Sequence, residues 1–281
     1  MKNLLIIGYG KWGKKIIKNL INTKIYNDIF IKTRNSYYKY DFKLNDKKKF
    51  LENPKKKYDR VHIGVPTDQH YSVLKKYLNI KNLSIEKPLF NDLKYFKKIN
   101  KKFIKVNYID LYNPITKFIF KYIKEKKITS IHLNYCGKDY FKNQYFFLDE
   151  WLDHPLSLLL STYNPMQLKK IKTSKINKIE KKNIFEALLK CKDINIKITI
   201  KSNLAKKRLV TLTTETKDKI TYDFLRNKIF INKKLIYETN TSPIENFFTL
   251  RNGNKQKKQI ESLIFHKKIF KFKKKMLEKL A

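Results

Sequence analysis

Cysteine, arginine, glycine and long apolar runs are all scarce in this chain of 281 residues. The two cysteines, Cys136 and Cys191, lie outside any CxxC motif and cannot build a disulfide framework. No stretch approaches the ~18 consecutive apolar residues of a membrane span, and the apolar run before Gly8 is too short for a signal peptide. We therefore expect a cytoplasmic protein with free thiols and no membrane partner.

Arginine supplies only five of the 65 basic residues, although the formal net charge is +41. Dense positive charge attracts the phosphate backbones of nucleic acids. Proteins that read grooves and phosphates depend on the bidentate arginine fork, however, and lysine cannot reproduce it. We expect a solvated, lysine-rich surface and no nucleic-acid partner. Polyanion binding stays open as the alternative that charge alone favours.

Short apolar segments alternate with helical patterns through the first 111 residues. Strands are expected at "KNLLIIG", "DIFIKTRN", "YDRVHIGVPT", "LSIEKP" and "KFIKVNYI", with helical segments between them. Strands that alternate with helices form right-handed crossovers and a parallel sheet. The predicted fold class is therefore α/β, with a doubly wound Rossmann domain for dinucleotide binding over residues 1–111.

The pattern changes over residues 112–281. Pro114 suits the first turn of a helix. Ile194, Ile196, Ile198 and Ile200 then alternate strictly, and later segments continue with a period of two. This pattern predicts a C-terminal α+β domain, for substrate binding and oligomerisation, whose large mixed or antiparallel sheet buries one face.

The segment "IIGYGKWGKK" carries three glycines in GxGxxG spacing between a buried strand and a helix. In such a unit Gly8 allows the tight turn, Gly10 lets a pyrophosphate approach the backbone, and Gly13 lets the helix pack on the strand. The helix N-terminus offers N–H groups to the phosphates. This context favours dinucleotide binding over a plain connecting turn. The other residues of this loop that we expect to contact the cofactor are Tyr9, Lys11 and Trp12.

The end of the second expected strand distinguishes the two nicotinamide cofactors. An NAD site usually carries an acidic residue there for the ribose 2′-hydroxyl. The segment "FIKTRNS" has none, and instead offers Thr33 and Arg34, which suit a 2′-phosphate. NADP is therefore the preferred cofactor and NAD the alternative. No metal site is expected, because HExxH and paired CxxC spacings are absent from the sequence.

Residues 61–90, "VHIGVPTDQHYSVLKKYLNIKNLSIEKPLF", carry the most specific signal. A strand ends in a Pro-Thr turn, a His and a helix follow, and the next strand closes in Glu-Lys-Pro. With the N-terminal GxGxxG, this order resembles the Gfo/Idh/MocA oxidoreductases, named after glucose-fructose oxidoreductase and inositol dehydrogenase. The resemblance is strong to residue 120 and only architectural after residue 165. It implies cofactor contacts from Pro66, Thr67, His70, Glu86 and Lys87.

The same resemblance implies the catalytic residues. The family's Glu-Lys-Pro lysine lies beside the nicotinamide and the substrate carbon, which makes Lys87 the first candidate. An ammonium at a strand's carboxyl end can also polarise an oxygen. The segment "FLDEWLDHPLS" is similar to the family's Asp-x-x-x-His motif, which matches His154 to the acid/base and Glu150 to the acidic residue. The alternative for His154 is a cap on a leucine-rich core helix.

The implied activity is reversible hydride transfer between NADP(H), or NAD(H), and a carbinol or keto carbon of a sugar, cyclitol or nucleotide-sugar. Asn107 and Tyr112 follow the last strand of the first domain and are candidates for substrate contacts at the carboxyl ends of the strands. Boundary turns use the same residue types. An imine (C=N) reductase and an inactive dinucleotide-binding sensor or scaffold stay open. The resemblance further implies a homo-oligomer.

Overall fold

The computed structural model describes residues 2–23, 25–34, 36–40, 48–51, 57–137, 148, 151–163, 165–177, 182–202, 204–249 and 259–280. The chain divides into two compact units. Unit 1 contains Met1–Tyr108 and Ile244–Phe270, and unit 2 contains Ile109–Pro243 and Lys271–Ala281. The predicted domain boundary after residue 111 lies near the first junction. The units differ from the predicted domains in the C-terminal segment, part of which belongs to unit 1.

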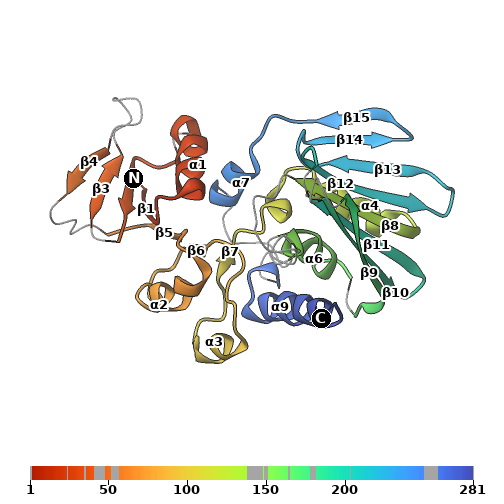
Figure 1. The fold of residues 1–281 in the computed structure, drawn as a ribbon. Helices are drawn as coiled ribbons and strands as arrows, with labels where there is room; N and C mark the ends of the chain where they lie inside the picture. The colour runs from red at the N-terminus through yellow and green to blue at the C-terminus, as the bar shows by residue number, and fades with distance from the viewer. Residues whose placement is uncertain are drawn as a thin grey trace. The chain divides into compact units, whose positions relative to one another are not determined.

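Unit 1 is built on a seven-stranded sheet in its described residues (Figure 1). Its strands are β1 (Asn3–Ile7), β2 (Asp28–Lys32), β3 (Tyr37–Tyr40), β4 (Lys48–Leu51), β5 (Arg60–Ile63), β6 (Leu83–Ile85) and β7 (Lys105–Val106). They lie in the order β4-β3-β2-β1-β5-β6-β7. The run from β2 to β7 is parallel, as predicted, and β3 and β4 add an antiparallel pair at one edge.

Helices connect the parallel strands of unit 1. Helix α1 turns Ile16, Ile17 and Leu20 into the core, and each such side chain contributes about 1.5–3 kcal/mol when fully buried. The helical segment between β5 and β6 starts as a 3₁₀ turn. The helical segments are α1 (Lys11–Leu20), η1 (Ile21–Thr23), η2 (Thr67–Gln69), α2 (His70–Lys75), α3 (Leu93–Lys98) and α7 (Pro243–Thr249).

Two basic side chains explain why the segment from Ile244 belongs to unit 1. Arg60 donates to the carbonyl oxygens of Phe247 and Phe248 at 3.3 and 2.7 Å, and buried Lys105 also donates to Phe247. Cations at a helix C-terminus satisfy its unpaired carbonyls and complement its dipole. The end of α7 is thereby held on strands β5 and β7.

Unit 2 contains an eight-stranded mixed sheet in its described part. The strand order is β15-β14-β13-β12-β8-β11-β10-β9, with β8 parallel to β11 and antiparallel to β12. These strands are β8 (Ile128–Gly137), β9 (Gln167–Asn177), β10 (Lys182–Cys191), β11 (Ile194–Ser202), β12 (Lys207–Thr214), β13 (Lys219–Asp223), β14 (Lys228–Ile231) and β15 (Lys234–Glu238).

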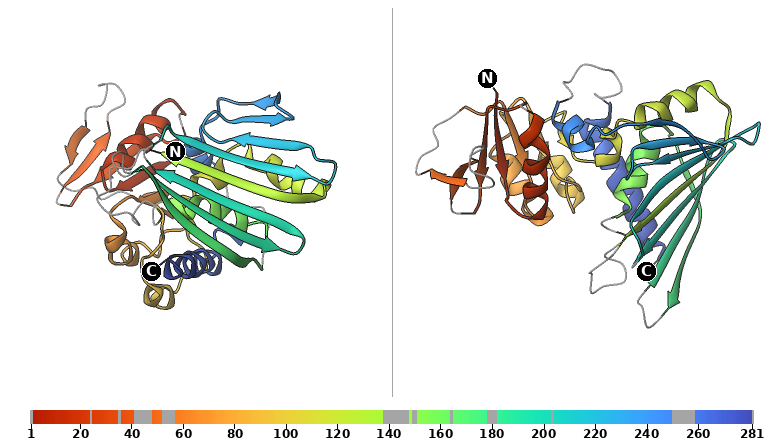
Figure 2. Two further views of the ribbon diagram at one scale, coloured as in Figure 1. Left: turned by 45° about the vertical axis from the view of Figure 1, so that its right-hand side comes forward. Right: turned by 90° about the horizontal axis from the view of Figure 1, so that it is seen from above.

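Helices cover one face of the unit 2 sheet, as the right-hand view of Figure 2 shows. The buried face carries Leu133, Tyr135, Ile198 and Leu212, as the period of two predicted. No helix among the described residues of this unit covers the other face. The helical segments are η3 (Ile109–Tyr112), α4 (Thr116–Glu125), α6 (Asp153–Leu160) and α9 (Leu263–Glu278), whose residues are divided between the two units. No described helix is long and apolar enough to cross a membrane.

His266 of α9 is expected to make the protein sensitive to mild acid. Its ring is 1% exposed, Nε2 donates to the Ile104 carbonyl at 2.8 Å, and burial lowers its pKa to about 4. A histidine in an unfolded chain titrates near a pKa of about 6.5. As the pH falls from 6.5 to 4, the unfolded chain therefore binds the proton first and stability is lost.

We expect this residue to account for a loss of about 2 kcal/mol between pH 7 and pH 5. Urea unfolding at the two pH values measures the loss in the wild type and in His266→Gln. The variant should lose less stability than the wild type over this interval. An equal loss in both proteins would contradict the assignment.

Candidate functional site

The residues that follow the parallel strands of unit 1 line one edge of its sheet. Strand register places Ile7 beside Ile63, Ile63 beside Ile85, and Ile85 beside Val106. The residue after each of these strand ends continues the hydrogen-bonded ladder, with backbone N–H to carbonyl distances of 2.7–2.9 Å. The bonds run from Gly8 to Lys32, Gly64 to Ile7, Glu86 to Ile63 and Asn107 to Ile85. The predicted cofactor turn, the Glu-Lys-Pro strand end and Asn107 therefore share the carboxyl edge, where open α/β sheets bind ligands.

The three glycines of GxGxxG meet different surroundings. Gly8 has φ +97°, and a Cβ there would lie 2.6 Å from the Gly64 oxygen. A Cβ on Gly13 would lie 2.3 Å from the Gly8 oxygen. A Cβ on Gly10 would meet nothing of the described protein within 4 Å. Gly8 and Gly13 are thus required by the fold, whereas no internal contact requires glycine at position 10.

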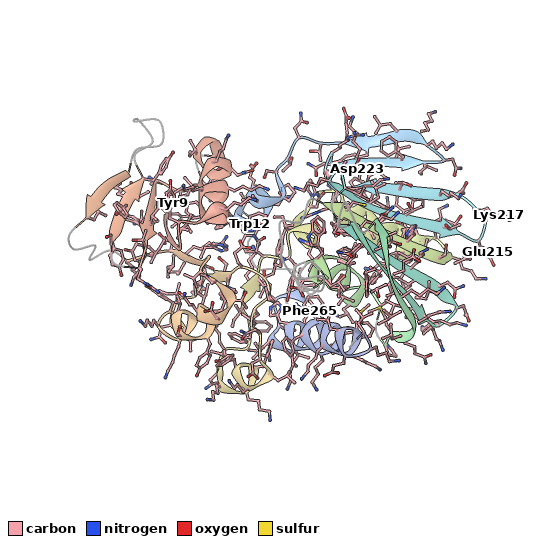
Figure 3. All side chains as sticks on the ribbon, viewed as in Figure 1. Tyr9, Trp12, Glu215, Lys217, Asp223 and Phe265 are labelled. Carbon is pink, nitrogen blue, oxygen red and sulfur yellow. The ribbon has the colours of Figure 1, made fainter. Side chains whose placement is uncertain are left out.

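The N-terminus of α1 has the properties of an anion site. Gly10 is its N-cap, no side chain caps its free N–H groups, and its first turn holds no acidic residue. Such N–H groups and the positive end of the helix dipole attract phosphate. Tyr9 and exposed Trp12 lie where β1 passes into α1 (Figure 3). Together with the open space at Gly10, these features fit the pyrophosphate of a dinucleotide.

The end of β2 presents basic and hydroxyl groups. The Thr33 hydroxyl and main-chain N–H both donate to the Ser36 carbonyl, at 3.2 and 2.9 Å, which closes the turn. Arg34 is exposed at this turn. Lys32 lies 4.7 Å from the centre of the Tyr37 ring. Among the described residues of this turn none is acidic, which leaves it suited to a phosphate.

A buried polar cluster supports the Glu-Lys-Pro turn. The Glu86 oxygen Oε1 accepts from Asn107 Nδ2 at 2.7 Å and lies 3.2 Å from His62 Nε2, while His62 Nδ1 lies 3.1 Å from the Ser84 hydroxyl. Burial acts to raise the pKa of the Glu86 carboxyl, but the hydrogen bond and charge of His62 and the hydrogen bond from Asn107 outweigh it and lower that pKa. Glu86 is thereby held as a carboxylate next to half-exposed Lys87.

His70, a predicted cofactor contact, is buried between two turns. The residue is 1% exposed, with Nε2 2.9 Å from the Val65 carbonyl and Nδ1 2.9 Å from the Pro88 carbonyl. Burial lowers its pKa. These contacts join the turn after β5 to the turn after β6. Pro66 is exposed and Thr67 half-exposed in the first of these turns, where a cofactor can reach them.

A second cluster surrounds His154 in unit 2. Helix α6 begins at Asp153, so Pro155 lies in its first turn, where proline is tolerated. The Nδ1 atom of His154 lies 3.4 Å from Asp110 Oδ2, and Nε2 lies 3.4 Å from Arg208 Nη2. Asp110 also accepts from Tyr135 and Arg208, both at 3.0 Å. The imidazole thus lies between a carboxylate and a guanidinium.

The groups of this cluster shift one another's pKa values. Burial acts to raise the pKa of Asp110, but the positive charge of Arg208 and the contacts with His154 and Tyr135 hold it well below its ordinary value. Burial and the Asp110 charge raise the pKa of Tyr135 well above its ordinary value. Asp110 is therefore a carboxylate and Tyr135 a neutral phenol at neutral pH.

Of the site residues predicted for unit 2, His154 and Tyr112 lie among the described residues. Glu150 lies outside them. Tyr112 is described and 4% exposed at the end of η3, where little of its surface can meet a substrate. Asp110, Tyr135 and Arg208 were not predicted. Arginine is rare in this chain, which could have drawn attention to Arg208. Nothing in the sequence indicates that Arg208 pairs with a carboxylate 98 residues earlier.

No family model matches the sequence, and no curated protein matches it. Solved structures do match. The UDP-N-acetylglucosamine 3-dehydrogenase GnnA of Acidithiobacillus ferrooxidans has a TM-score of 0.70 at 12% identity, covering 98% of this chain and 96% of its own. A Gfo/Idh/MocA family oxidoreductase from Vibrio cholerae has a TM-score of 0.66 at 12% identity, covering 100% and 99%.

The biliverdin reductase of Synechocystis, solved with biliverdin and NADP+, has a TM-score of 0.63 at 10% identity and covers 98% of both chains. Likeness at such low identity establishes the fold. The two-part architecture of this chain is that of Gfo/Idh/MocA-type oxidoreductases, as the motifs in residues 61–90 predicted.

Proposed function

We propose that this chain, which has the fold of the Gfo/Idh/MocA-type oxidoreductases, binds NADP(H) and transfers hydride to or from a carbinol or keto carbon. The observation that carries the proposal is Gly10, which leaves open space beside the uncapped N-terminus of α1. A glycine needed only for the fold would meet protein atoms, as Gly8 in the turn and Gly13 in the helix do. A glycine needed for a bound phosphate meets none when the ligand is absent.

Residues of this chain would orient the substrate oxygen and transfer its proton. The nicotinamide, when bound, supplies or accepts the hydride. In the oxidative direction the carbinol loses a hydride from carbon and a proton from oxygen, and a C=O bond forms. Lys87 would orient and polarise that oxygen, and His154 would take its proton, since imidazole exchanges protons near neutral pH. Glu86 would hold the Glu-Lys-Pro turn through its contacts with His62 and Asn107.

Arg34 is proposed to select NADP over NAD. A guanidinium at the end of β2 can pair with the 2′-phosphate, and hydrogen bonds to a charged group contribute about 1.5–3 kcal/mol. We therefore expect NADPH to bind about 10–100-fold more tightly than NADH. Titration of the protein at moderate salt, followed by the fluorescence of bound nicotinamide, measures both affinities.

Arg34→Ala should remove the preference by weakening NADPH binding alone. Arg226→Ala is the matched control, because Arg226 is 76% exposed on the other unit and lies 3.9 Å from Asp223. It should leave both affinities unchanged. If neither cofactor binds the folded wild type, the proposed function fails and the glycines only form a turn.

The proposed substrates are sugars, cyclitols and nucleotide-sugars, and the reductase of a C=N bond is the second candidate. The GnnA neighbour supports a nucleotide-sugar, and biliverdin reductase shows that the fold also accepts a different substrate class. Oxidation of NADPH in the presence of keto-sugars or of cyclic imines separates the two candidates. Cofactor binding without turnover on either panel would favour a dinucleotide-binding sensor.

We also propose a cytoplasmic homo-oligomer. Cys136 and Cys191 are free and buried thiols, in keeping with a reducing compartment. The face of the unit 2 sheet opposite α4 and α6 offers a surface on which two copies can pair. Light scattering on the purified protein tests this, and a monomer at micromolar concentration would contradict it.

A further inference from the structure

We propose that Asp110 and Arg208 are positioning residues for His154, which together keep the proton of its neutral ring on Nδ1 and leave Nε2 as the atom that exchanges the substrate proton. The inference deepens the proposed function and rests on it for the role of His154. The arrangement of the three side chains stands on the contacts within unit 2 alone.

Asp110 is fixed from both its main chain and its side chain. Its carbonyl accepts from the Thr116 hydroxyl and from the Asn113 N–H, which anchors the end of η3 to the start of α4. Its carboxylate oxygens accept separately, Oδ1 from Arg208 and Oδ2 from Tyr135. Asp110 is 2% exposed, so little solvent competes for its carboxylate. Oδ2 is therefore held facing the imidazole.

The ring of His154 is oriented by aromatic neighbours. Tyr135 stacks on it with 6.2 Å between ring centres and 17° between planes, and Trp151 meets it edge-on at 6.4 Å. The Arg208 guanidinium lies 5.6 Å from the centre of the Trp151 ring, and strand pairing places Arg208 directly opposite Tyr135. The Ser157 hydroxyl donates a hydrogen bond to the His154 carbonyl oxygen at 2.9 Å. Packing thus fixes which nitrogen faces which charge.

The two charges dictate the position of the proton. A carboxylate only accepts hydrogen bonds and a guanidinium only donates them. The nitrogen beside Asp110 is therefore the protonated one, and the nitrogen beside Arg208 carries the lone pair. Asp110 stabilises the imidazolium that forms when Nε2 takes a proton, while Arg208 opposes it. The opposing effects keep His154 able to gain and release a proton, as an acid/base residue requires.

Other titratable groups that described elements place around α6 are balanced. Asp153, next to His154, lies 3.1 Å from Lys273 of α9, and both side chains are at least 95% buried. Tyr135 stays neutral because its pKa is raised. Asp110 on η3 and Arg208 on β12, which pair with each other at 3.0 Å, are thus the charges that the described elements direct at the two ring nitrogens.

The experiment is histidine NMR on the intact protein labelled with ¹³C and ¹⁵N in histidine, without cofactor or substrate. The chain has five histidines, so His154→Gln assigns the His154 signals and the other four serve as internal references. In the wild type the ¹⁵N shifts should show the Nδ1–H tautomer. Asp110→Asn should lower the His154 pKa by about one unit or more, and Arg208→Gln should raise it.

The control is Asp223→Asn, since the Asp223 carboxylate accepts from N–H groups of its own turn, Leu225 and Arg226, and lies 3.9 Å from the Arg226 side chain. It should leave the His154 pKa unchanged. An Nε2–H tautomer in the wild type overturns the proposal even if Asp110→Asn fails to fold. An unchanged His154 pKa in folded Asp110→Asn and Arg208→Gln overturns it as well. Because no reaction is measured, these results are independent of whether the chain proves to be an oxidoreductase.

Discussion

Gly10→Val is expected to abolish NADPH binding and leave the fold intact. The new side chain would enter space in which no described protein atom lies within 4 Å of the Cβ, and the Gly10 backbone is extended, with φ −77° and ψ −165°. A phosphate placed over the N-terminus of α1 would occupy the same space. Two lost hydrogen bonds to a charged group correspond to at least about 3 kcal/mol, or on the order of 100-fold in affinity.

Gly13→Ala is the contrasting variant. Its Cβ would lie 2.3 Å from the Gly8 oxygen, which is backbone and cannot rotate away. Helix α1 would have to move off β1, and such overpacking costs about 1–3 kcal/mol or more. We therefore expect Gly13→Ala to lower the unfolding midpoint in urea, while Gly10→Val unfolds like the wild type.

Cofactor fluorescence and urea unfolding on the three proteins test this pair together. The informative result is the separation of the two effects, with binding lost at position 10 and stability lost at position 13. Normal NADPH binding by Gly10→Val would contradict the phosphate site at α1, whatever the stability of Gly13→Ala.

The first sheet was largely predictable because its signals are local. Strand β1 is an apolar run closed by Gly8, and the parallel order of the strands follows from the helices between them. The structure confirms this fold class. Strands β3 and β4 were missed because they are short and lie at the edge of the sheet, where charged side chains such as Lys39 are tolerated and the apolar pattern weakens.

Two long strands of unit 2 were also missed for physical reasons. Strand β10 contains "EALL", whose residues favour a helix, but pairing with β9 and β11 along its whole length overrides that preference. Strand β9 is an edge strand that contains four lysines, which interrupt its apolar pattern. The period-two segment "KIFINKKLIYE" forms two strands, because Asn232 and Lys233 take positive φ values of 49° and 72° and form a hairpin turn.

The candidate site shows the same difference between signals that are local in the sequence and contacts that are distant in it. The glycine turn and Glu-Lys-Pro lie within contiguous motifs, so spacing alone indicates them. The contacts of His154 come from Asp110, Tyr135 and Arg208, on three elements separated by long stretches of sequence. Only sheet register and the burial of Asp110 bring them together, and neither is encoded in a short motif.

Lys87→Met and His154→Gln are each expected to lower turnover with little effect on NADPH affinity. General acid–base groups contribute about 10²–10⁴-fold to rate, so we expect kcat to fall by that factor in each variant. Methionine matches the length of lysine without its charge, and glutamine keeps a polar side chain near Asp110 and Arg208. Steady-state oxidation of NADPH with a substrate identified in the panels provides the measurement.

Lys81→Met is the matched control for Lys87→Met. Lys81 is exposed just before β6, and Lys87 follows the other end of the same short strand. Both substitutions remove one of many lysine charges, so a general effect of charge would appear equally in both. We expect normal kcat in Lys81→Met. An equal loss in the two lysine variants would remove Lys87 from the proposed mechanism.

The double variant Lys87→Met/His154→Gln separates one shared reaction step from two unrelated defects. Groups that act as a unit give strongly non-additive losses, because removing either disables the step that both serve. We therefore expect the double variant to be little slower than the slower single variant. If the two losses instead multiply, Lys87 and His154 do not serve the same step, and the division of roles between polarising the oxygen and exchanging its proton is wrong.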